Sequence, residues 1–214
     1  MKQNRTWFLK GIRDGIPIAL GYIAVSFTIG IAAKNTGLTA FQAALMSLTN
    51  NTSAGEFAAL GLIASGASYM EMALTQLIIN LRYSLMSAAL SQTLSRNTQF
   101  IHRPLLAYGV TDEIFGVSIG VEGKLNPFYS YGVISVAAPA WALGTFLGVV
   151  TGNILSGQIL GALSVALYGM FIAVIIPPAR KNKVLAGLIA VSMGASLLFA
   201  YLPLVREISA GFRI

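Results

Sequence analysis

The chain has 214 residues, of which 56% are hydrophobic and only 10% are charged, and its formal net charge is +7. Soluble domains carry about 25% charged residues, so this composition excludes an ordinary water-soluble domain. The Lys and Arg residues cluster beside apolar runs rather than along one basic face, which indicates membrane topology signals and no nucleic-acid partner. Because the chain has no Cys and a single His102, we predict no disulfide, no metal site and no cofactor.

Apolar runs bounded by glycine, proline and charged residues predict seven membrane-spanning helices, since about 20 apolar residues cross the hydrocarbon layer of a bilayer. We place the spans near residues 15–33, 41–65, 70–94, 105–121, 128–153, 157–176 and 185–204. The remaining loops are too short for a water-soluble domain. The predicted fold class is all-α: a polytopic membrane helix bundle with residues 1–214 as a single transmembrane domain.

An odd number of spans places the basic N-terminus and the basic residues at 180–183 on the same side, which the positive-inside rule assigns to the cytoplasm. The C-terminus then lies outside. Arg96 and Arg103, between the third and fourth spans, fall on the outer side in this arrangement, against the rule. The first apolar run has no convincing small-residue cleavage site, so we interpret it as a retained first span.

The second span is interrupted at about mid-membrane depth by the polar run Asn50-Asn51-Thr52-Ser53, with Glu56 just beyond it. We predict a broken helix there. Non-helical backbone at this depth is stable only where protein or a water-filled cavity surrounds it, and transporters use such helix ends to hold ligands. The alternative is two short apolar segments joined by a surface loop.

The third span carries a polar stripe along one helical face, formed by Gln76, Asn80, Tyr83, Ser84, Ser87 and Ser91. Such a stripe should face protein or a solvated path, because lipid would leave its hydrogen-bonding groups unpaired. Two interpretations remain open. The stripe either lines a path for a solute or joins neighbouring helices through hydrogen bonds.

Ionisable residues inside the predicted spans are the strongest functional signal. Arg82 lies near the middle of the third span, Glu56 at the break in the second, and Asp112 with Glu113 midway along the fourth. An unpaired charge at a helix centre costs about 3 kcal/mol, so we expect these groups to meet. One arginine neutralises one carboxylate, and at least one other carboxyl is expected to be protonated part of the time, which permits proton coupling. Alternatively, the pair that Arg82 forms is a static link between helices.

Glycines recur at four-residue spacing in the later spans. Gly144, Gly148 and Gly152 lie in the fifth span, and Gly157 and Gly161 lead into the sixth. Small residues at this spacing let two helices approach closely. The facing helix belongs either to the same chain or to a separate small subunit.

Several short motifs are specific when they are taken together. They are Gly-Ile-Arg-Asp-Gly-Ile-Pro from Gly11, Ser-Ala-Gly-Glu-Phe-Ala from Ser53, Gly-Ala-Ser from Gly66 followed by Glu71, Asn-Leu-Arg-Tyr from Asn80 and Gly-Val-Thr-Asp-Glu from Gly109. Jointly they resemble the azaleucine-resistance (AzlC-type) family of branched-chain amino acid exporters. The family often has glutamine where this chain has Glu56.

The resemblance implies the large permease subunit of a secondary transporter in the bacterial plasma (inner) membrane. Such a transporter exports leucine, isoleucine, valine and analogues with the energy of the proton gradient, in a hetero-oligomer with a small multi-span membrane subunit. We expect the substrate-binding or proton-coupling residues to be Asn50, Asn51, Thr52, Glu56, Gln76, Asn80, Arg82, Thr111, Asp112 and Glu113.

Other classes of function can be weighed against the sequence. An intramembrane enzyme is not favoured, because the sequence has no paired catalytic aspartate motif, no suitably placed Ser and His, and no metal-ligand helix. We therefore predict that the chain is not an enzyme. The alternatives to a transporter are a structural subunit of a membrane assembly, in which the polar residues are fully paired, and a channel for another small solute.

Overall fold

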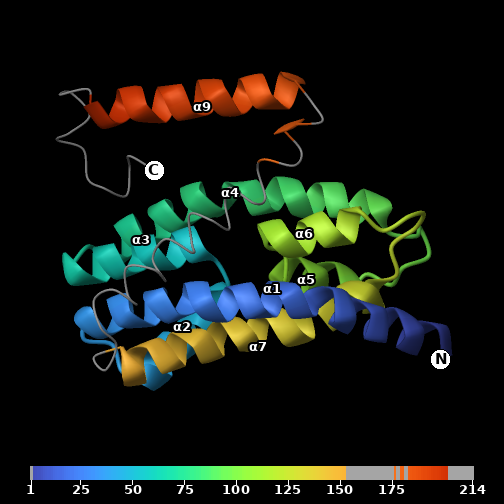
Figure 1. The fold of residues 1–214 in the computed structure, drawn as a ribbon, viewed down its shortest axis with the longest axis horizontal. Coiled ribbons are helices and arrows are strands. Elements are labelled where there is room, and N and C mark those ends of the chain that lie inside the picture. Colours follow the sequence, from blue (N-terminus) through green and yellow to red (C-terminus); the bar gives the residue numbers. More distant parts are fainter. Residues whose placement is uncertain (1, 153–175, 177–178, 181–182, 202–214) are drawn as a thin grey trace.

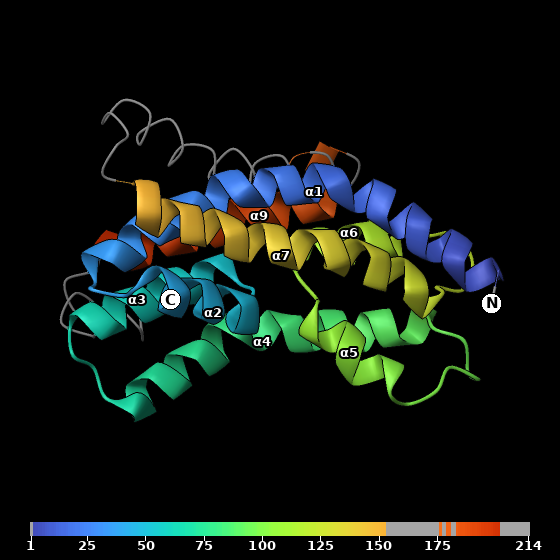
Figure 2. The same ribbon diagram turned by 90° about the horizontal axis from the view of Figure 1, so that it is seen from below.

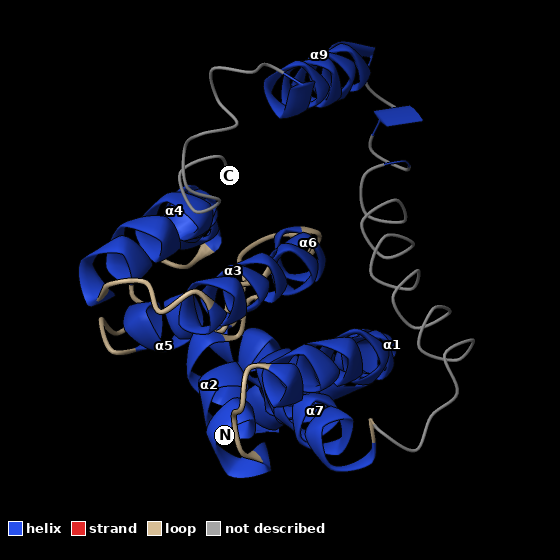
Figure 3. Cartoon of the chain, turned by 90° about the vertical axis from the view of Figure 1, so that its left-hand side faces the viewer, coloured by secondary structure: helices blue, strands red, loops and turns tan. Residues whose placement is uncertain are grey.

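The structure is a computed structural model that describes residues 2–152, 176, 179–180 and 183–201. Within these residues the fold is all-helical and has no β-strand (Figure 1). The helices are α1 (Lys2–Asn35), α2 (Ala40–Asn50), α3 (Ser53–Ala64), α4 (Tyr69–Thr93), α5 (His102–Tyr108), α6 (Asp112–Ile119), α7 (Pro127–Thr151) and α9 (Lys183–Tyr201). Helices α1 to α7 pack together, and α9 lies apart from them (Figure 3).

The centre of the molecule is the pair of long helices α1 and α7, which lie side by side (Figure 2). They run in the same direction, because Gly11 of α1 lies against Tyr129 of α7 and Gly30 lies against Gly148. The two backbones touch at these points, since a glycine has no side chain to hold them apart. Both helices are long and apolar enough to cross a membrane.

Helices α2 and α3 fold back on each other as a hairpin, here called hairpin A (residues 40–64). The short loop 36–39 joins α2 to the end of α1, and the short loop 65–68 joins α3 to the start of α4. Helix α3 runs antiparallel to α4, because Thr52 bonds Tyr83 whereas Gly55, further along α3, bonds Gln76, earlier on α4. Hairpin A therefore enters and leaves at the same end of the molecule (Figures 1 and 2).

The tip of hairpin A is defined by Asn51 and Thr52. Asn51 has a φ of 48° in the left-handed region, which an asparagine tolerates better than most residues, and it ends α2. Thr52 is extended, and its side chain accepts a hydrogen bond from the backbone N–H of Gly55. This is the usual geometry of an N-cap, so the local sequence both ends one helix and begins the next.

Helices α5 and α6 form a second hairpin, here called hairpin B (residues 102–119). His102, at the start of α5, lies 2.7 Å from the Tyr131 hydroxyl, and Ser118, near the end of α6, lies 3.1 Å from the Ser130 hydroxyl. Both contacts are with the first turns of α7. Hairpin B therefore enters and leaves at the end where α1 and α7 begin, opposite to hairpin A (Figure 1).

The two hairpins belong to an inverted repeat. Each is followed by a 25-residue helix that runs the length of the molecule, α4 after hairpin A and α7 after hairpin B. The N-cap Thr52 precedes the N-cap Ser68 of α4 by 16 positions, and the N-cap Thr111 precedes the N-cap Asn126 of α7 by 15. The unit α2 to α4 thus recurs as α5 to α7 in the opposite direction.

The hairpins change the predicted count of spans. The segments 41–65 and 105–121 do not cross as single helices, so the prediction of one span in each is wrong. Among the described helices, only α1 and α7 are both long enough and apolar enough to be membrane spans. The predicted spans 70–94 and 185–204 correspond to α4 and α9, which do not meet both conditions. The predicted span 157–176 lies almost wholly outside the described residues.

The hairpins also change where the basic residues lie. The backbone N–H of Leu125 donates to Thr93, and the Asn126 side chain donates to Asn4 at 3.1 Å, so the loops after α4 and α6 meet the start of α1. Arg96 and Arg103 therefore lie at the same end as the N-terminus. The seven-span arrangement wrongly placed them at the other end, because it counted hairpin A as a crossing.

Candidate functional site

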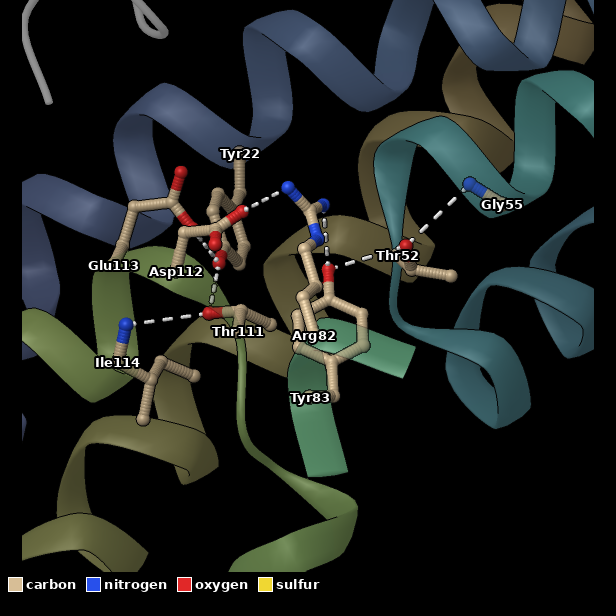
Figure 4. Close-up of polar contacts among 9 residues, drawn as sticks. All are labelled: Tyr22, Thr52, Gly55, Arg82, Tyr83, Thr111, Asp112, Glu113 and Ile114. Atoms are coloured by element: carbon tan, nitrogen blue, oxygen red, sulfur yellow. Dashed lines mark hydrogen bonds and ion pairs between the residues drawn. The ribbon is translucent and has the colours of Figure 1, made fainter. Parts of the chain in front are cut away.

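The tips of hairpins A and B meet in the middle of the molecule, where α3 and α6 both begin (Figure 4). They enclose a cavity of about 10 Å³, lined by Tyr22, Asn51, Thr52, Ser53, Tyr83, Thr111, Asp112, Glu113 and Trp141. A space of this size holds about one water molecule. The partial positive charges at the N-termini of two helices face this one space.

Arg82 and Asp112 form an ion pair at the cavity (Figure 4). Arg82 Nη1 lies 3.1 Å from Asp112 Oδ2, and the two side chains are 37% and 20% exposed. Arg82 Nη2 donates to the Tyr83 hydroxyl at 3.2 Å, and the guanidinium lies over the Tyr83 ring at 4.9 Å from its centroid. Arg82 Nε is buried and has no hydrogen-bond partner among the described residues. The arginine therefore keeps one donor free.

Glu113 points to a different neighbour from Asp112. Its carboxylate accepts a hydrogen bond from the Tyr22 hydroxyl at 2.7 Å, and the same hydroxyl lies 2.6 Å from Thr111 Oγ1 (Figure 4). Thr111 also caps α6 by accepting from the N–H of Ile114. Asp112 and Glu113 start α6 rather than lying midway along a span, as was predicted. At a helix N-terminus carboxylates are stabilised by the helix dipole.

The N-terminus of α3 differs from that of α6 because the acid in its first turn, Glu56, does not line the cavity, whereas Asp112 and Glu113 of α6 do. Beside it lies the Asn51 side chain, which is 4% exposed and lines the cavity. Neither its amide nitrogen nor its oxygen has a hydrogen-bond partner within the part of the chain that is described. A buried amide without partners costs free energy, so this position fits a group that binds the cavity from outside the protein.

Glu56, one of the expected substrate-binding or proton-coupling residues, does not line the cavity. It is fully buried, and its two oxygens accept hydrogen bonds from Trp141 Nε1 at 2.9 Å and Ser47 Oγ at 2.7 Å. Ser47 in turn contacts Thr145 at 2.6 Å. No cation is among these partners. Glu56 instead holds the indole of Trp141, whose ring lines the cavity.

The chain matches the model of one protein family, described as AzlC protein, over residues 17–155. The chain belongs to the AzlC family. The match covers α1 from Pro17 onward, both hairpins, α4 and α7, so it includes every residue that lines the cavity. No solved structure matches the chain.

Relatives of this AzlC family member are named as membrane proteins. An uncharacterised membrane protein of Archaeoglobus fulgidus is 32% identical over 197 residues, which are 91% of this chain and 85% of the relative. Inner membrane protein YgaZ of Escherichia coli is 25% identical, over 95% of this chain and 87% of its own length. An uncharacterised membrane protein of Helicobacter pylori is 27% identical over 68% of this chain and 66% of its own. The chain is thus a membrane protein of the AzlC family.

The remaining expected site residues of this AzlC family member lie behind the cavity. Gln76 Nε2 donates to the Gly55 carbonyl at 2.8 Å and so joins α4 to α3, whereas Asn80 donates to the Gln76 oxygen at 3.1 Å within α4. Asn50, the last residue of α2, does not line the cavity either. The polar stripe of α4 is therefore divided: Gln76 joins α4 to α3, Asn80 bonds Gln76 within α4, and Tyr83 reaches the cavity.

The glycines expected to pack or to bind a partner lie within the α1–α7 pair where they are described. A side chain at Gly144 or Gly148 would collide with the backbone of α1 at Ile23 or Phe27, and one at Gly152 would meet Ile31. The same chain therefore supplies the facing helix. Gly157 and Gly161 lie outside the described residues.

Three aromatic side chains at the cavity were absent from the expected site. Tyr22 and Trp141 meet edge to face at 5.0 Å, and Tyr83 closes the other side. Tyr22 and Trp141 stand in apolar runs, where an aromatic residue gives no polar signal. Comparison of the two repeats does indicate two of these residues, because Tyr83 and Trp141 occupy equivalent positions, each 15 residues after the N-cap of its long helix.

Proposed function

We propose that this AzlC family member is the large subunit of a secondary transporter that exports leucine, isoleucine, valine and their analogues across the bacterial inner membrane. It acts together with a small multi-span membrane subunit. The observation that carries the proposal is the cavity at which α3 and α6 both begin. The unpartnered Asn51 amide lies on the α3 side, and the carboxylates of Asp112 and Glu113 lie on the α6 side. Inverted repeats with helix ends at mid-depth are typical of secondary transporters.

The two helix ends suggest how a zwitterion would lie. The substrate carboxylate takes the N-terminus of α3, where the unpartnered Asn51 amide can meet it. The substrate ammonium takes the N-terminus of α6, where Asp112 and Glu113 stand. The aromatic rings of Tyr22 and Trp141 then face the branched side chain. This pose uses each charge of an amino acid once.

The cavity is too small for an amino acid in the state described, since about 10 Å³ holds about one water. Binding therefore requires one hairpin to move. Hairpin A is connected at the end of the molecule where α1 ends, and hairpin B at the end where α1 begins. Movement of hairpin A therefore opens the cavity to the first of these ends, and movement of hairpin B opens it to the second. Two hairpins of opposite direction are sufficient for alternating access.

The orientation in the membrane follows from the basic residues. Five basic residues gather at the end where α1 begins: Lys2, Arg5, Arg13, Arg96 and Arg103. At the other end Lys34 lies in the last turn of α1, and the loops 36–39 and 65–68 contain no basic residue. The positive-inside rule assigns the basic end to the cytoplasm. Hairpin B then opens to the cytoplasm and hairpin A to the outside.

The absence of cysteine from the sequence allows a direct test of this topology. A single cysteine at Ala67 should react with an impermeant maleimide added to intact cells, and one at Asn97 should react only after the cells are opened, because the two loops lie at opposite ends. The seven-span arrangement predicts the reverse pattern for both positions. Labelling of the two variants therefore separates the hairpin topology from seven crossings.

Proton coupling is assigned to Glu56, which is buried without a cation and touches the cavity through Trp141. Replacing Glu56 by glutamine keeps an acceptor for the Trp141 N–H and mimics the protonated acid. We expect the variant to exchange external for internal leucine at a near-normal rate, but to lose the stimulation of efflux by a proton gradient. Glu71→Gln, in the first turn of α4, is the matched control. If a proton gradient still stimulated leucine efflux by the Glu56→Gln variant, a group other than Glu56 would carry the coupled proton.

The transport function is tested by efflux from cells that lack their own exporters. Cells loaded with a leucine-containing dipeptide should release labelled leucine when the chain is co-expressed with the proposed small membrane subunit. Glutamate-containing and lysine-containing dipeptides serve as specificity controls. Equal efflux with and without the chain, at verified expression of both subunits, contradicts the proposal and leaves a structural subunit as the function.

A further inference from the structure

A second, much larger cleft lies at the end of the molecule where α1 begins. It has a volume of about 620 Å³ and is bounded by the first turns of α1, the start of α7 and the last turn of α6 with the loop that follows. None of its residues lines the central cavity. Its volume falls within the range of small-molecule binding sites, about 300–1,000 Å³.

The wall formed by α1 and α7 already holds a primary ammonium group. Lys10 Nζ lies 5.5 Å from the centroid of the Trp7 ring and 5.0 Å from that of Tyr129, and it is 3.7 Å from Asp14 Oδ2. The Tyr129 hydroxyl donates to the same Asp14 oxygen at 2.9 Å, which fixes the carboxylate against the rings. Two aromatic rings and a carboxylate are the groups that bind ammonium ligands.

The opposite wall has the other features that an aliphatic amino acid requires. Val117 and Val121 of the α6 side are apolar, and Glu122 follows them with a second carboxylate. The cleft therefore combines one cation, two carboxylates, two aromatic rings and an apolar wall. An anion would pair only with the Lys10 ammonium, and a simple cation would contact only the carboxylates and rings, so neither ligand would contact all of these groups.

We infer that this cleft is a second binding site for the zwitterionic aliphatic amino acid, at the cytoplasmic entrance. The inference rests on the proposed function. The substrate ammonium takes the place of the Lys10 ammonium over the two rings and against Asp14, and Lys10 then meets the substrate carboxylate. The branched side chain lies on Val117 and Val121.

Two helix faces lead from the cleft to the central cavity. On α1, Asp14 and Tyr22 lie eight positions apart, about 80° around the helix, so both fall within one stripe about 100° wide. On α6, Val117 and Glu113 are four positions apart and share a face in the same way. Nothing lies within 4 Å of the point where a side chain at Gly116 would begin, so this part of α6 is open. A substrate released from the cleft thus meets Tyr22 and Glu113 next.

The stoichiometry of leucine binding tests the inference. Equilibrium binding of labelled leucine to the purified complex in lipid nanodiscs should reach two molecules per chain in the wild type. Asp14→Asn should leave one, Arg82→Gln should leave one, and the double variant should bind none. Trp7→Leu keeps an apolar side chain and should weaken one of the two sites about fivefold. Glu71→Gln, an acid at the opposite end, should retain both sites.

The outcomes separate this inference from the proposed function. A single wild-type site that Arg82→Gln removes and that both Asp14→Asn and Trp7→Leu leave unchanged contradicts the cleft and supports the central site. A single site with the opposite response supports the cleft and contradicts the central pose. Absence of leucine binding to a folded wild-type complex contradicts both. Elution of each variant as a single peak in gel filtration establishes that it is folded.

Discussion

Arg82→Gln should lower leucine efflux by about 100-fold at normal expression of the protein. The substitution removes the cation that pairs with Asp112 at 3.1 Å and leaves the Asp112 carboxylate, which lines the cavity, without that partner. An unpaired charge at mid-membrane depth costs about 3 kcal/mol, and about 1.4 kcal/mol corresponds to tenfold. Initial efflux rates, normalised to the amount of protein in the membrane, measure the effect.

A charge reversal distinguishes binding from a static link between helices. Arg82→Asp combined with Asp112→Arg restores the ion pair between α4 and α6, so we expect normal expression. Transport should stay low, because the carboxylate and ammonium of the substrate would then meet like charges. Full recovery of efflux would make the pair a structural link and would remove Arg82 from the binding site. Arg96→Gln, in the loop after α4, is the control for loss of a basic residue.

Gly148→Val should abolish the folded protein. A Cβ at this position would overlap the carbonyl oxygen of Phe27 and come against Gly30 Cα, and neither backbone atom can move without separating α1 from α7. Overpacking at such a contact costs about 1–3 kcal/mol or more, which is a large part of the stability of a typical domain, about 5–15 kcal/mol. Detergent extraction followed by gel filtration should show aggregated protein or none.

Glycine substitutions elsewhere in the same chain provide the control. Nothing lies within 4 Å of the point where a side chain at Gly21 or Gly61 would begin, so Gly21→Ala and Gly61→Ala should elute as the wild type does. Both positions lie inside helices, where alanine is favoured over glycine by about 1 kcal/mol. If Gly148→Val were as well folded as these variants, the α1–α7 contact would not be essential to the fold.

Helix positions were predictable from the sequence, but helix directions were not. Apolar runs locate α1, α4 and α7 because these helices are each long enough to span. Segment 41–65 would have the same apolar content whether it formed one long helix that crosses or two short helices that fold back on each other. Its sequence therefore gives no sign that the chain reverses direction. The reversal depends on contacts of Thr52 with Tyr83 and of Ser47 with Thr145, which are distant in sequence.

The break before α6 did leave a sign in the sequence. Thr111 followed by Asp112 and Glu113 is the usual start of a helix, with a capping hydroxyl and two acids in the first turn. The apolar residues on both sides favoured a continuous span and outweighed that sign. The comparable Thr52 was recognised only because polar residues surround it.

The charged part of the site was predictable because burial of charge is costly, and the aromatic part was not. The cost of an unpaired charge in a membrane indicated that Arg82 had a carboxylate partner, and Asp112 is that partner. The same reasoning placed Glu56 among the substrate-binding or proton-coupling residues. It overlooked neutral donors, since the Trp141 indole and the Ser47 hydroxyl satisfy this carboxyl without any cation.

Polar groups in the first half of the chain have hydrogen-bonding or ion-pair partners in the second half, and this affects how the protein is inserted into the membrane during synthesis. Glu56 and Ser47 bond each other, but their other partners, Trp141 and Thr145, leave the ribosome much later, and Arg82 precedes Asp112. Lipid offers no substitute for these partners. The first half of the chain must therefore wait in a wet or protein-lined site of the insertion machinery, and a nascent chain cut after α4 should be degraded rather than released into the bilayer.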